Sequence, residues 1–162
     1  MISTNSFNIY NASAGTGKTF SLVRDYLCLL LNSNNYELYK NILAITFTNK
    51  AVNEMKGRII KYLINYSNSV DPDLIMLKEI SKKTGLSKKE IFLKSSTILK
   101  NLLKNYSAFE ISTIDKLTQK IVRNFTYELG IDSKYEVEID QNEIINRAVD
   151  NLISKIELND DS

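Results

Sequence analysis

Residues 12–19 constrain the fold of this chain more than any other part of the sequence. The run reads Ala-Ser-Ala-Gly-Thr-Gly-Lys-Thr, follows a short apolar stretch at residues 7–10 and precedes an apolar-periodic segment at residues 20–31. A strand, a glycine-bearing loop, a Lys-Thr pair and a helix in this order are typical of a phosphate-binding P-loop. Glycines let backbone N–H groups converge on a phosphate, and the positive end of the following helix attracts an anion. The sequence therefore predicts an α/β fold with a nucleotide site at this loop.

The residues of this loop have distinct expected roles. Lys18 is a point charge for the β- and γ-phosphates, and the Thr19 hydroxyl is a hard oxygen ligand suited to Mg²⁺. The residues expected to bind ATP are Ala12, Ser13, Ala14, Gly15, Thr16, Gly17, Lys18 and Thr19. Ala12 stands where the usual pattern begins with glycine. The alternative interpretation is an ordinary strand-to-helix turn with an exposed lysine.

Composition excludes several kinds of site. The 162 residues contain no histidine, which removes histidine-based metal sites and histidine acid–base catalysis. The single cysteine, Cys28, lies among leucines, so we expect a buried hydrophobic residue rather than a nucleophile, in a reducing, cytoplasmic setting. We expect no membrane contact and no secretion signal, because no apolar run approaches the roughly 18 residues of a span.

Charge is distributed unevenly along the chain. Residues 1–130 hold 18 Lys or Arg and 10 Asp or Glu, a balance of +8, whereas residues 131–162 hold 3 and 9, a balance of −6. A basic body suits a polyanionic partner. A solvated, lysine-rich surface is the alternative interpretation.

Apolar patterns predict two further strands, each followed by a helix. A continuous apolar run at residues 42–47 is typical of a buried parallel strand, and residues 109–113 form another short apolar stretch. A helix follows Asn49, and its buried stripe is expected to contain Val52, Met55, Ile59 and Leu63, with Glu54 and Arg58 paired on another face. The helix after the second of these strands is expected to end at Gly130.

Helical signals also fill the stretch between these two strands. Asp71 and Pro72 are typical of a helix start, Gly85 breaks that helix, and Ser87 with Glu90 predicts a capping box for the next one. Three strands separated by helices predict parallel βαβ units. The long crossover between the second and third strands is therefore expected to be an all-α insertion.

The chain ends in a segment of different character. Residues 135–139 alternate apolar and charged side chains, which is typical of an extended segment. Asp140 and Glu143 form a second capping pair before a last apolar-periodic helix, and the polar tail after it is expected to fray.

Three motifs in this order resemble those of UvrD/Rep-type superfamily 1 DNA helicases. Residues 12–19 resemble the first motif of that family, where alanine often replaces the leading glycine, and they are most similar to the RecB/AddA branch. Residues 45–59, which begin Ile-Thr-Phe-Thr-Asn-Lys-Ala, are similar to motif Ia. Residues 111–115, Ile-Ser-Thr-Ile-Asp, resemble the following motif of the Thr-Ile-His-Ser-Phe type.

The resemblance implies a fold, an activity and partners. The fold is a P-loop NTPase (RecA-like) parallel sheet, incomplete, with a helical insertion and a C-terminal helical segment. Residues 1–130 would be the N-terminal part of helicase domain 1A, with the insertion at residues 65–107, and residues 131–162 would begin helical subdomain 1B and end in a frayed tail. The activity is ATP-dependent translocation on single-stranded DNA in repair or recombination. ATP and Mg²⁺ are the implied cofactors, and nuclease or helicase subunits the implied partners.

The resemblance also implies a set of DNA-binding residues. These residues are Thr46, Phe47, Asn49 and Thr113. Phe47 is the candidate platform on which a base stacks, because every base offers a π-face. A phenylalanine buried at the end of a strand is the alternative. Lys120 and Arg123 are further candidates for phosphate contacts, for which simple surface solvation is the alternative.

The chain departs from the family pattern in several ways. Asp115 stands where the family usually has histidine, and an aspartate would repel DNA phosphate at that position. The paired Asp-Glu of the family's second motif does not occur in the sequence. The arginines of a second motor domain are also missing. We therefore expect an N-terminal fragment or a truncated gene product that holds no catalytic residue and is inactive alone.

Two other functions remain open at this stage. A small nucleotide kinase would carry its acidic Mg²⁺ residue and an arginine-rich lid, whereas the arginines of this chain are scattered: Arg24, Arg58, Arg123 and Arg147. Residues 79–91, with a glycine between two amphipathic segments, resemble a helix-turn-helix, which predicts a DNA-binding module instead.

Overall fold

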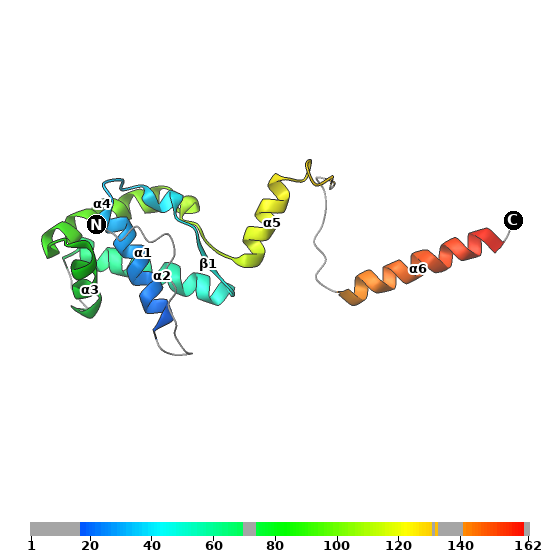
Figure 1. Ribbon diagram of the computed structural model, residues 1–162, viewed down its shortest axis with the longest axis horizontal. Coiled ribbons are helices and arrows are strands. Elements are labelled where there is room, and N and C mark those ends of the chain that lie inside the picture. Colours follow the sequence, from blue (N-terminus) through cyan, green and yellow to red (C-terminus); the bar gives the residue numbers. More distant parts are fainter. Residues whose placement is uncertain (1–16, 70–73, 131, 133–140, 161–162) are drawn as a thin grey trace. The chain divides into compact units, whose positions relative to one another are not determined.

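The computed structural model describes residues 17–69, 74–130, 132 and 141–160, without the side chains of residues 141 and 154–160 (Figure 1). Contacts divide the chain into two units, Met1–Thr118 and Gln119–Ser162. The first strand expected from the sequence, at residues 7–10, and the helix-start signal at Asp71 and Pro72 lie outside the described residues. The extended segment expected at residues 135–139 and the cap expected at Asp140 lie outside them as well.

The first unit combines four helices with two short strands. The elements in chain order are α1 (Lys18–Asn32), the 3₁₀ turn η1 (Leu38–Asn41), β1 (Ala44–Thr46), α2 (Asn49–Ser67), α3 (Leu74–Thr84), α4 (Lys88–Lys104), the 3₁₀ turn η2 (Tyr106–Ala108) and β2 (Ile111–Thr113). Helix α5 (Ile114–Asn124) continues from β2 across the boundary of the units, and α6 (Gln141–Asp160) belongs to the second unit. None of the described helices is long and apolar enough to span a membrane.

The two strands form a parallel pair. Ala44 lies opposite Ile111 and Thr46 lies opposite Thr113, so both strands end at the same edge. The parallel direction agrees with the βαβ arrangement expected from the sequence. The strands are shorter than expected, and β1 is not the fully buried strand predicted, because Ile45 is 46% exposed. The described part of the chain thus contains a helix-rich α/β fold with a small sheet.

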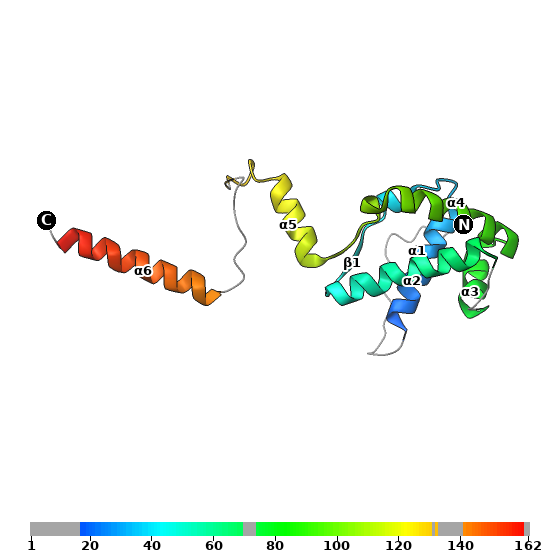
Figure 2. The same cartoon turned by 180° about the vertical axis from the view of Figure 1, so that it is seen from behind.

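The core of the first unit lies where α2 meets α4, α1 and β2. Helix α2 packs along α4, and α1 packs against α3 and α2, as both ribbon views show (Figures 1 and 2). The predicted stripe of α2 is confirmed, because its apolar side chains are buried: Val52, Met55, Ile59 and Leu63. The rings of Tyr66 on α2 and Phe92 on α4 stack with centroids 6.0 Å apart. Cys28 is buried in this core, as predicted.

The turn between α3 and α4 follows its local sequence. Gly85 has a φ of +73°, a left-handed conformation that glycine adopts without a steric penalty. The predicted capping box is confirmed: the Glu90 N–H donates to Ser87 Oγ at 3.3 Å, and the Ser87 N–H donates to Glu90 Oε2 at 2.8 Å. The two signals together stop α3 and start α4 within three residues.

The end of α5 differs from the sequence prediction. The pattern predicts a helix as far as Gly130, but α5 ends at Asn124, and residues 125–130 form hydrogen-bonded turns instead. The apolar side chains of this stretch are exposed, including Phe125 (52%) and Leu129 (56%). Most helical stability in proteins comes from packing of an apolar face. Without that packing the periodic pattern does not extend the helix, although Gly130 does adopt a positive φ of 64°.

Candidate functional site

The described end of the expected phosphate loop consists of Gly17 and the first turn of α1. Gly17 has a φ of +85°, and its carbonyl accepts a hydrogen bond from the Ser21 N–H at 2.9 Å. Helix α1 therefore begins at Lys18, as a P-loop helix would. Lys18 is exposed and Thr19 is half-buried. The other expected loop residues lie outside the described part of the chain: Ala12, Ser13, Ala14, Gly15 and Thr16.

The start of α1 is electrostatically open to an anion. Its N-cap residue, Gly17, offers no side-chain hydrogen bond, and its first turn contains no acidic residue. The first N–H groups of a helix lack intrahelical partners and carry partial positive charge. Lys18 adds a full charge at the same place. The arrangement can bind a phosphate group.

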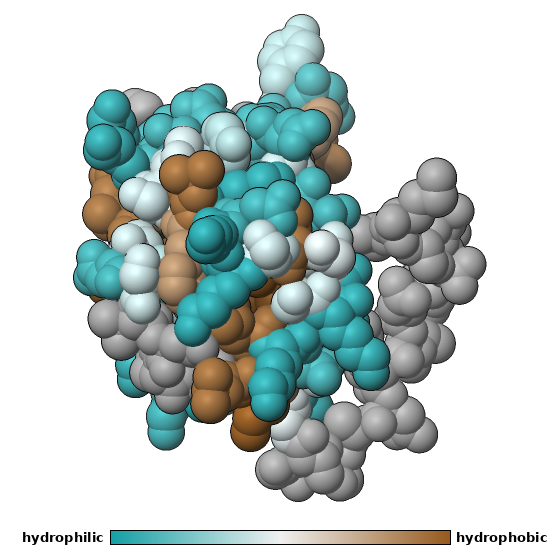
Figure 3. Space-filling view, turned by 90° about the vertical axis from the view of Figure 1, so that its left-hand side faces the viewer, coloured by the Kyte–Doolittle hydropathy of each residue, from teal (hydrophilic) through white to brown (hydrophobic). Residues whose placement is uncertain are grey.

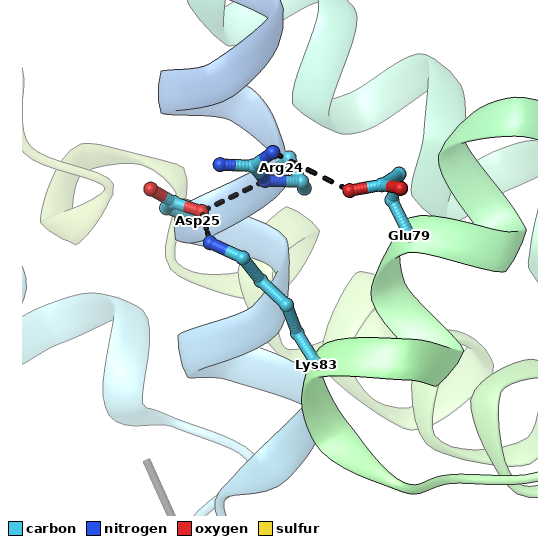
Figure 4. A network of polar contacts seen from close by, with 4 residues as sticks. All are labelled: Arg24, Asp25, Glu79 and Lys83. Atoms are coloured by element: carbon cyan, nitrogen blue, oxygen red, sulfur yellow. Dashed lines mark hydrogen bonds and ion pairs between the residues drawn. The ribbon is translucent and has the colours of Figure 1, made fainter. Parts of the chain in front are cut away.

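Helix α1 is held in place by side chains of α3 and α4. On α1, Arg24 Nε lies 2.9 Å from Asp25 Oδ1, and on α3, Lys83 Nζ lies 2.7 Å from the same oxygen (Figure 4). Arg24 also reaches Glu79 of α3, with Nη1 3.5 Å from Oε2 (Figure 4). These contacts fix the middle of the helix whose first turn carries Lys18.

The far end of α1 is capped by Lys94. Its Nζ donates to the carbonyl oxygens of Leu31 at 2.9 Å and Ser33 at 3.1 Å. A cation at the C-terminal end of a helix satisfies unpaired carbonyls and complements the helix dipole. No local pattern predicts this contact, because Lys94 and Leu31 lie 63 residues apart.

A second group of expected site residues lies at the carboxyl edge of the strand pair. Thr46 and Thr113 are opposite each other there. Phe47 follows Thr46 and is 86% exposed, so it is not the buried strand-end phenylalanine of the alternative interpretation. Asn49, also exposed, is the first residue of α2. The structure thus brings four expected DNA-binding residues to one edge.

Threonine hydroxyls at this edge start two helices. Thr48 is the N-cap of α2, where its Oγ1 accepts from the Ala51 N–H at 3.1 Å, and the Thr46 hydroxyl donates to the Thr48 carbonyl at 3.2 Å. Thr113 is buried, and its Oγ1 accepts from the Lys116 N–H at 3.3 Å, which caps the start of α5. The sequence reasoning missed Thr48, although a threonine immediately before a helix is a recognisable N-cap signal.

Two further residues gain an explanation from their positions. Asp115 lies in the first turn of α5, where a negative charge is favoured by the helix dipole. Lys56, within the motif at residues 45–59, lies over two rings, with Nζ 5.2 Å from the Tyr106 centroid and 5.4 Å from the Phe109 centroid. This lysine therefore ties α2 to the segment before β2 rather than to a ligand.

The region that resembled a helix-turn-helix is part of the main core. Helix α4 packs along α2 through its buried residues, Ile91, Ser95, Ile98 and Leu102. The hairpin of α3 and α4 is therefore embedded in the first unit and does not form a separate module. Among the described residues, no group of three or more Cys, Asp or Glu side chains is arranged to hold a metal ion.

Comparisons with known proteins agree with the motifs. The model of the UvrD/REP helicase N-terminal domain matches residues 2–162. The RecBCD enzyme subunit RecB of Buchnera aphidicola is 32% identical over 155 residues, which cover 88% of this chain and 12% of the relative. RecB of Borreliella burgdorferi is 35% identical over 129 residues, or 79% of this chain and 10% of the relative. An ATP-dependent helicase/nuclease subunit of Natranaerobius thermophilus is 28% identical over 148 residues, with 88% and 10% covered.

The matches cover most of this chain but little of each relative. The chain spans about a tenth of the length of these curated relatives. No solved structure matches it significantly. The family match and the three ordered motifs favour a helicase over a small kinase or an isolated DNA-binding module. The chain belongs to the UvrD/REP helicase N-terminal domain family.

Proposed function

We propose that this chain is the N-terminal ATP-binding portion of a RecB-like, ATP-dependent DNA helicase that translocates on single-stranded DNA in repair or recombination. The observation that carries the proposal is the start of α1, where left-handed Gly17 leads directly into Lys18 and Thr19. Relatives named as RecB and as ATP-dependent helicase/nuclease subunits support it.

In this proposal residues 12–19 bind the triphosphate of ATP. Lys18 contacts the β- and γ-phosphates, and the Thr19 hydroxyl is the protein ligand of Mg²⁺. The unpaired N–H groups and dipole of α1 supply the rest of the attraction. The anchoring of α1 by Lys83 and Lys94 supports this role, because a rigid helix holds Lys18 without an entropic cost on binding.

The carboxyl edge of β1 and β2 is proposed as the DNA-binding surface. Phe47 stacks on a base, and Thr46 and Asn49 contact the strand beside it. Thr113 acts as a positioning residue, since its hydroxyl already holds the start of α5. Ligands of open α/β sheets gather outside the carboxyl ends of the strands, which supports this choice.

The proposal extends to the organisation of the whole enzyme. Residues 1–130 are proposed as part of helicase domain 1A with an insertion at residues 65–107, and residues 131–162 as the start of subdomain 1B. Partner subunits with helicase or nuclease activity are proposed because relatives are named as subunits of such enzymes. The enzyme would work in the cytoplasm, where its DNA substrate lies.

A titration with a fluorescent ATP analogue tests the nucleotide site. Lys18→Ala should abolish binding by the chain, whereas Lys61→Ala, which removes an exposed lysine of α2, should leave binding unchanged. Equal binding by the Lys18→Ala variant and the unmodified chain would refute the site.

A further inference from the structure

The hairpin of α3 and α4 concentrates positive charge. Residues 74–104 contain eight lysines and two glutamates, a balance of +6, whereas the whole chain has a net charge of +2. Both glutamates are already engaged: Glu79 pairs with Arg24, and Glu90 closes the capping box with Ser87. The hairpin therefore carries most of its positive charge without local neutralisation.

Three of the eight lysines have internal partners. Lys83 pairs with Asp25, Lys88 lies 5.3 Å from the centroid of the Phe92 ring, and Lys94 caps α1. The other five are exposed and form no ion pair with any described residue: Lys78, Lys82, Lys89, Lys100 and Lys104. These five lysines have no evident role in holding the fold.

Three of the five lysines form one line along α4. Helical spacing puts Lys89, Lys100 and Lys104 on a single face, because 11 residues make about three turns and four residues about one. This face is opposite the one buried against α2, and we call the three residues the outer lysine stripe. Over a rise of 1.5 Å per residue, the stripe is roughly 22 Å long.

The surroundings of the stripe resemble those of a backbone-binding surface. Lys78 and Lys82 lie one turn apart on α3, beside the start of the stripe. Figure 3 views the end of the first unit where α3 and α4 lie, and hydrophilic side chains spread across it between apolar ones. The two helices contain a single aromatic residue, Phe92, and its ring is stacked on Tyr66. The hairpin thus offers charge but no platform for a base.

We propose that the outer lysine stripe, with Lys78 and Lys82, binds the phosphate backbone of duplex DNA without regard to sequence. Lysines that neutralise phosphates release counterions, which drives binding of this kind. Single strands are bound by aromatic stacking as well as charge. A straight, rigid line of charge without exposed rings suits a duplex, whose backbone is itself rigid and regularly charged. This surface is separate from the strand edge proposed for single-stranded DNA.

A pair of double variants with equal charge change tests the proposal. Lys89→Gln/Lys100→Gln removes two charges from the stripe, and Lys40→Gln/Lys61→Gln removes two exposed lysines elsewhere in the first unit. Glutamine has nearly the same helix propensity as lysine, so the fold of both variants should be kept, which circular dichroism checks. Binding of a labelled 20-base-pair duplex and a labelled 20-nucleotide single strand is followed by anisotropy between 50 and 200 mM salt.

The stripe variant should bind the duplex at least fivefold more weakly at 50 mM salt. Its slope of log affinity against log salt should fall by about 1–2, because each lost phosphate contact contributes roughly 0.9. The control variant should stay within twofold of the unmodified chain, and single-strand binding should change less than duplex binding. Lys89→Arg/Lys100→Arg should restore the duplex affinity.

Three results would overturn the proposal. Unchanged duplex binding by the stripe variant would remove it outright. An equal loss in both double variants would reduce the effect to net charge. A loss confined to the single strand would assign the stripe to the single-stranded path instead. None of these results depends on Phe47, so failure here is distinct from failure of the strand-edge proposal.

Discussion

Thr46 and Thr113 occupy the last rung of the parallel ladder between β1 and β2. Each strand continues into a helix within three residues, and each helix is capped by a threonine, Thr48 for α2 and Thr113 for α5. The positive ends of two helices are therefore directed to the edge that carries Phe47. An edge of this kind favours an anionic ligand, because helix N-termini attract phosphate.

Gly17→Ala should weaken nucleotide binding and destabilise the fold modestly. An alanine at a φ of +85° is strained by about 1–2 kcal/mol, although the added Cβ would meet no other atom within 4 Å. Gly85→Ala is the matched control, with a φ of +73° and equally open space. Chemical denaturation should give similar losses of stability for both variants, and a nucleotide titration should give a loss of affinity for Gly17→Ala alone.

Phe47→Ala should weaken single-strand binding without unfolding the chain. The ring is 86% exposed, so its removal should change stability by less than about 0.5 kcal/mol. Loss of one stacked base should cost about 1–3 kcal/mol of binding free energy. Tyr127→Ala is the control, because that ring is 93% exposed and lies in the second unit. Anisotropy with a labelled oligothymidylate measures both, and an equal effect of the two changes would contradict the role of Phe47.

The 162-residue chain should not hydrolyse ATP measurably, with or without DNA. Its sequence contains no Asp-Glu pair to hold Mg²⁺ and to position water. Positioning and charge stabilisation supply almost all of the catalysis of phosphoryl transfer. A phosphate-release assay checks this, with Lys18→Ala as the blank. DNA-stimulated turnover above that blank would show that the chain carries catalytic residues of its own.

The capping box of α4 should make stability depend on pH. Hydrogen bonds from the side chain and backbone of Ser87 lower the pKa of Glu90 in the folded chain. The stabilisation is therefore fully present above the ordinary glutamate pKa of about 4.3 and is lost as the pH falls through the lowered value. Glu90→Gln should lower the thermal midpoint at pH 7 and have no effect at pH 2. Ser87→Ala should cost about 1 kcal/mol at pH 7.

Cys28 should react slowly until the chain unfolds. Burial raises the pKa of its thiol to about 11, and the thiolate is the reactive form. Alkylation by iodoacetamide at pH 8 should be much slower than that of glutathione, and its rate should rise along the urea unfolding curve. Fast alkylation of the folded chain would place Cys28 at the surface.

The parts of the fold that are predicted well depend on neighbours along the chain. The stripe of α2 and the capping box of Ser87 and Glu90 rest on spacings of three and four residues, which a single helix fixes by itself. The end of α5 is predicted wrongly because Gly130 is a stop signal only when the helix before it is held by packing.

The parts that could not be predicted depend on residues far apart. Lys56 with the rings of Tyr106 and Phe109, and Lys94 with Leu31, meet only because the helices fold back on one another. The same holds for the strand edge. Motif resemblance suggested Thr46 and Phe47 as site residues, but only the tertiary arrangement shows that Phe47 is exposed and that Thr113 already uses its hydroxyl.

The contacts of Lys83 and Lys94 have a mechanical consequence. Both belong to the α3–α4 hairpin, and they grip α1 at its middle and at its end. A force applied to the hairpin is therefore transmitted along about 20 Å of rigid helix to Lys18. The hairpin and the first turn of α1 behave as the two arms of one lever.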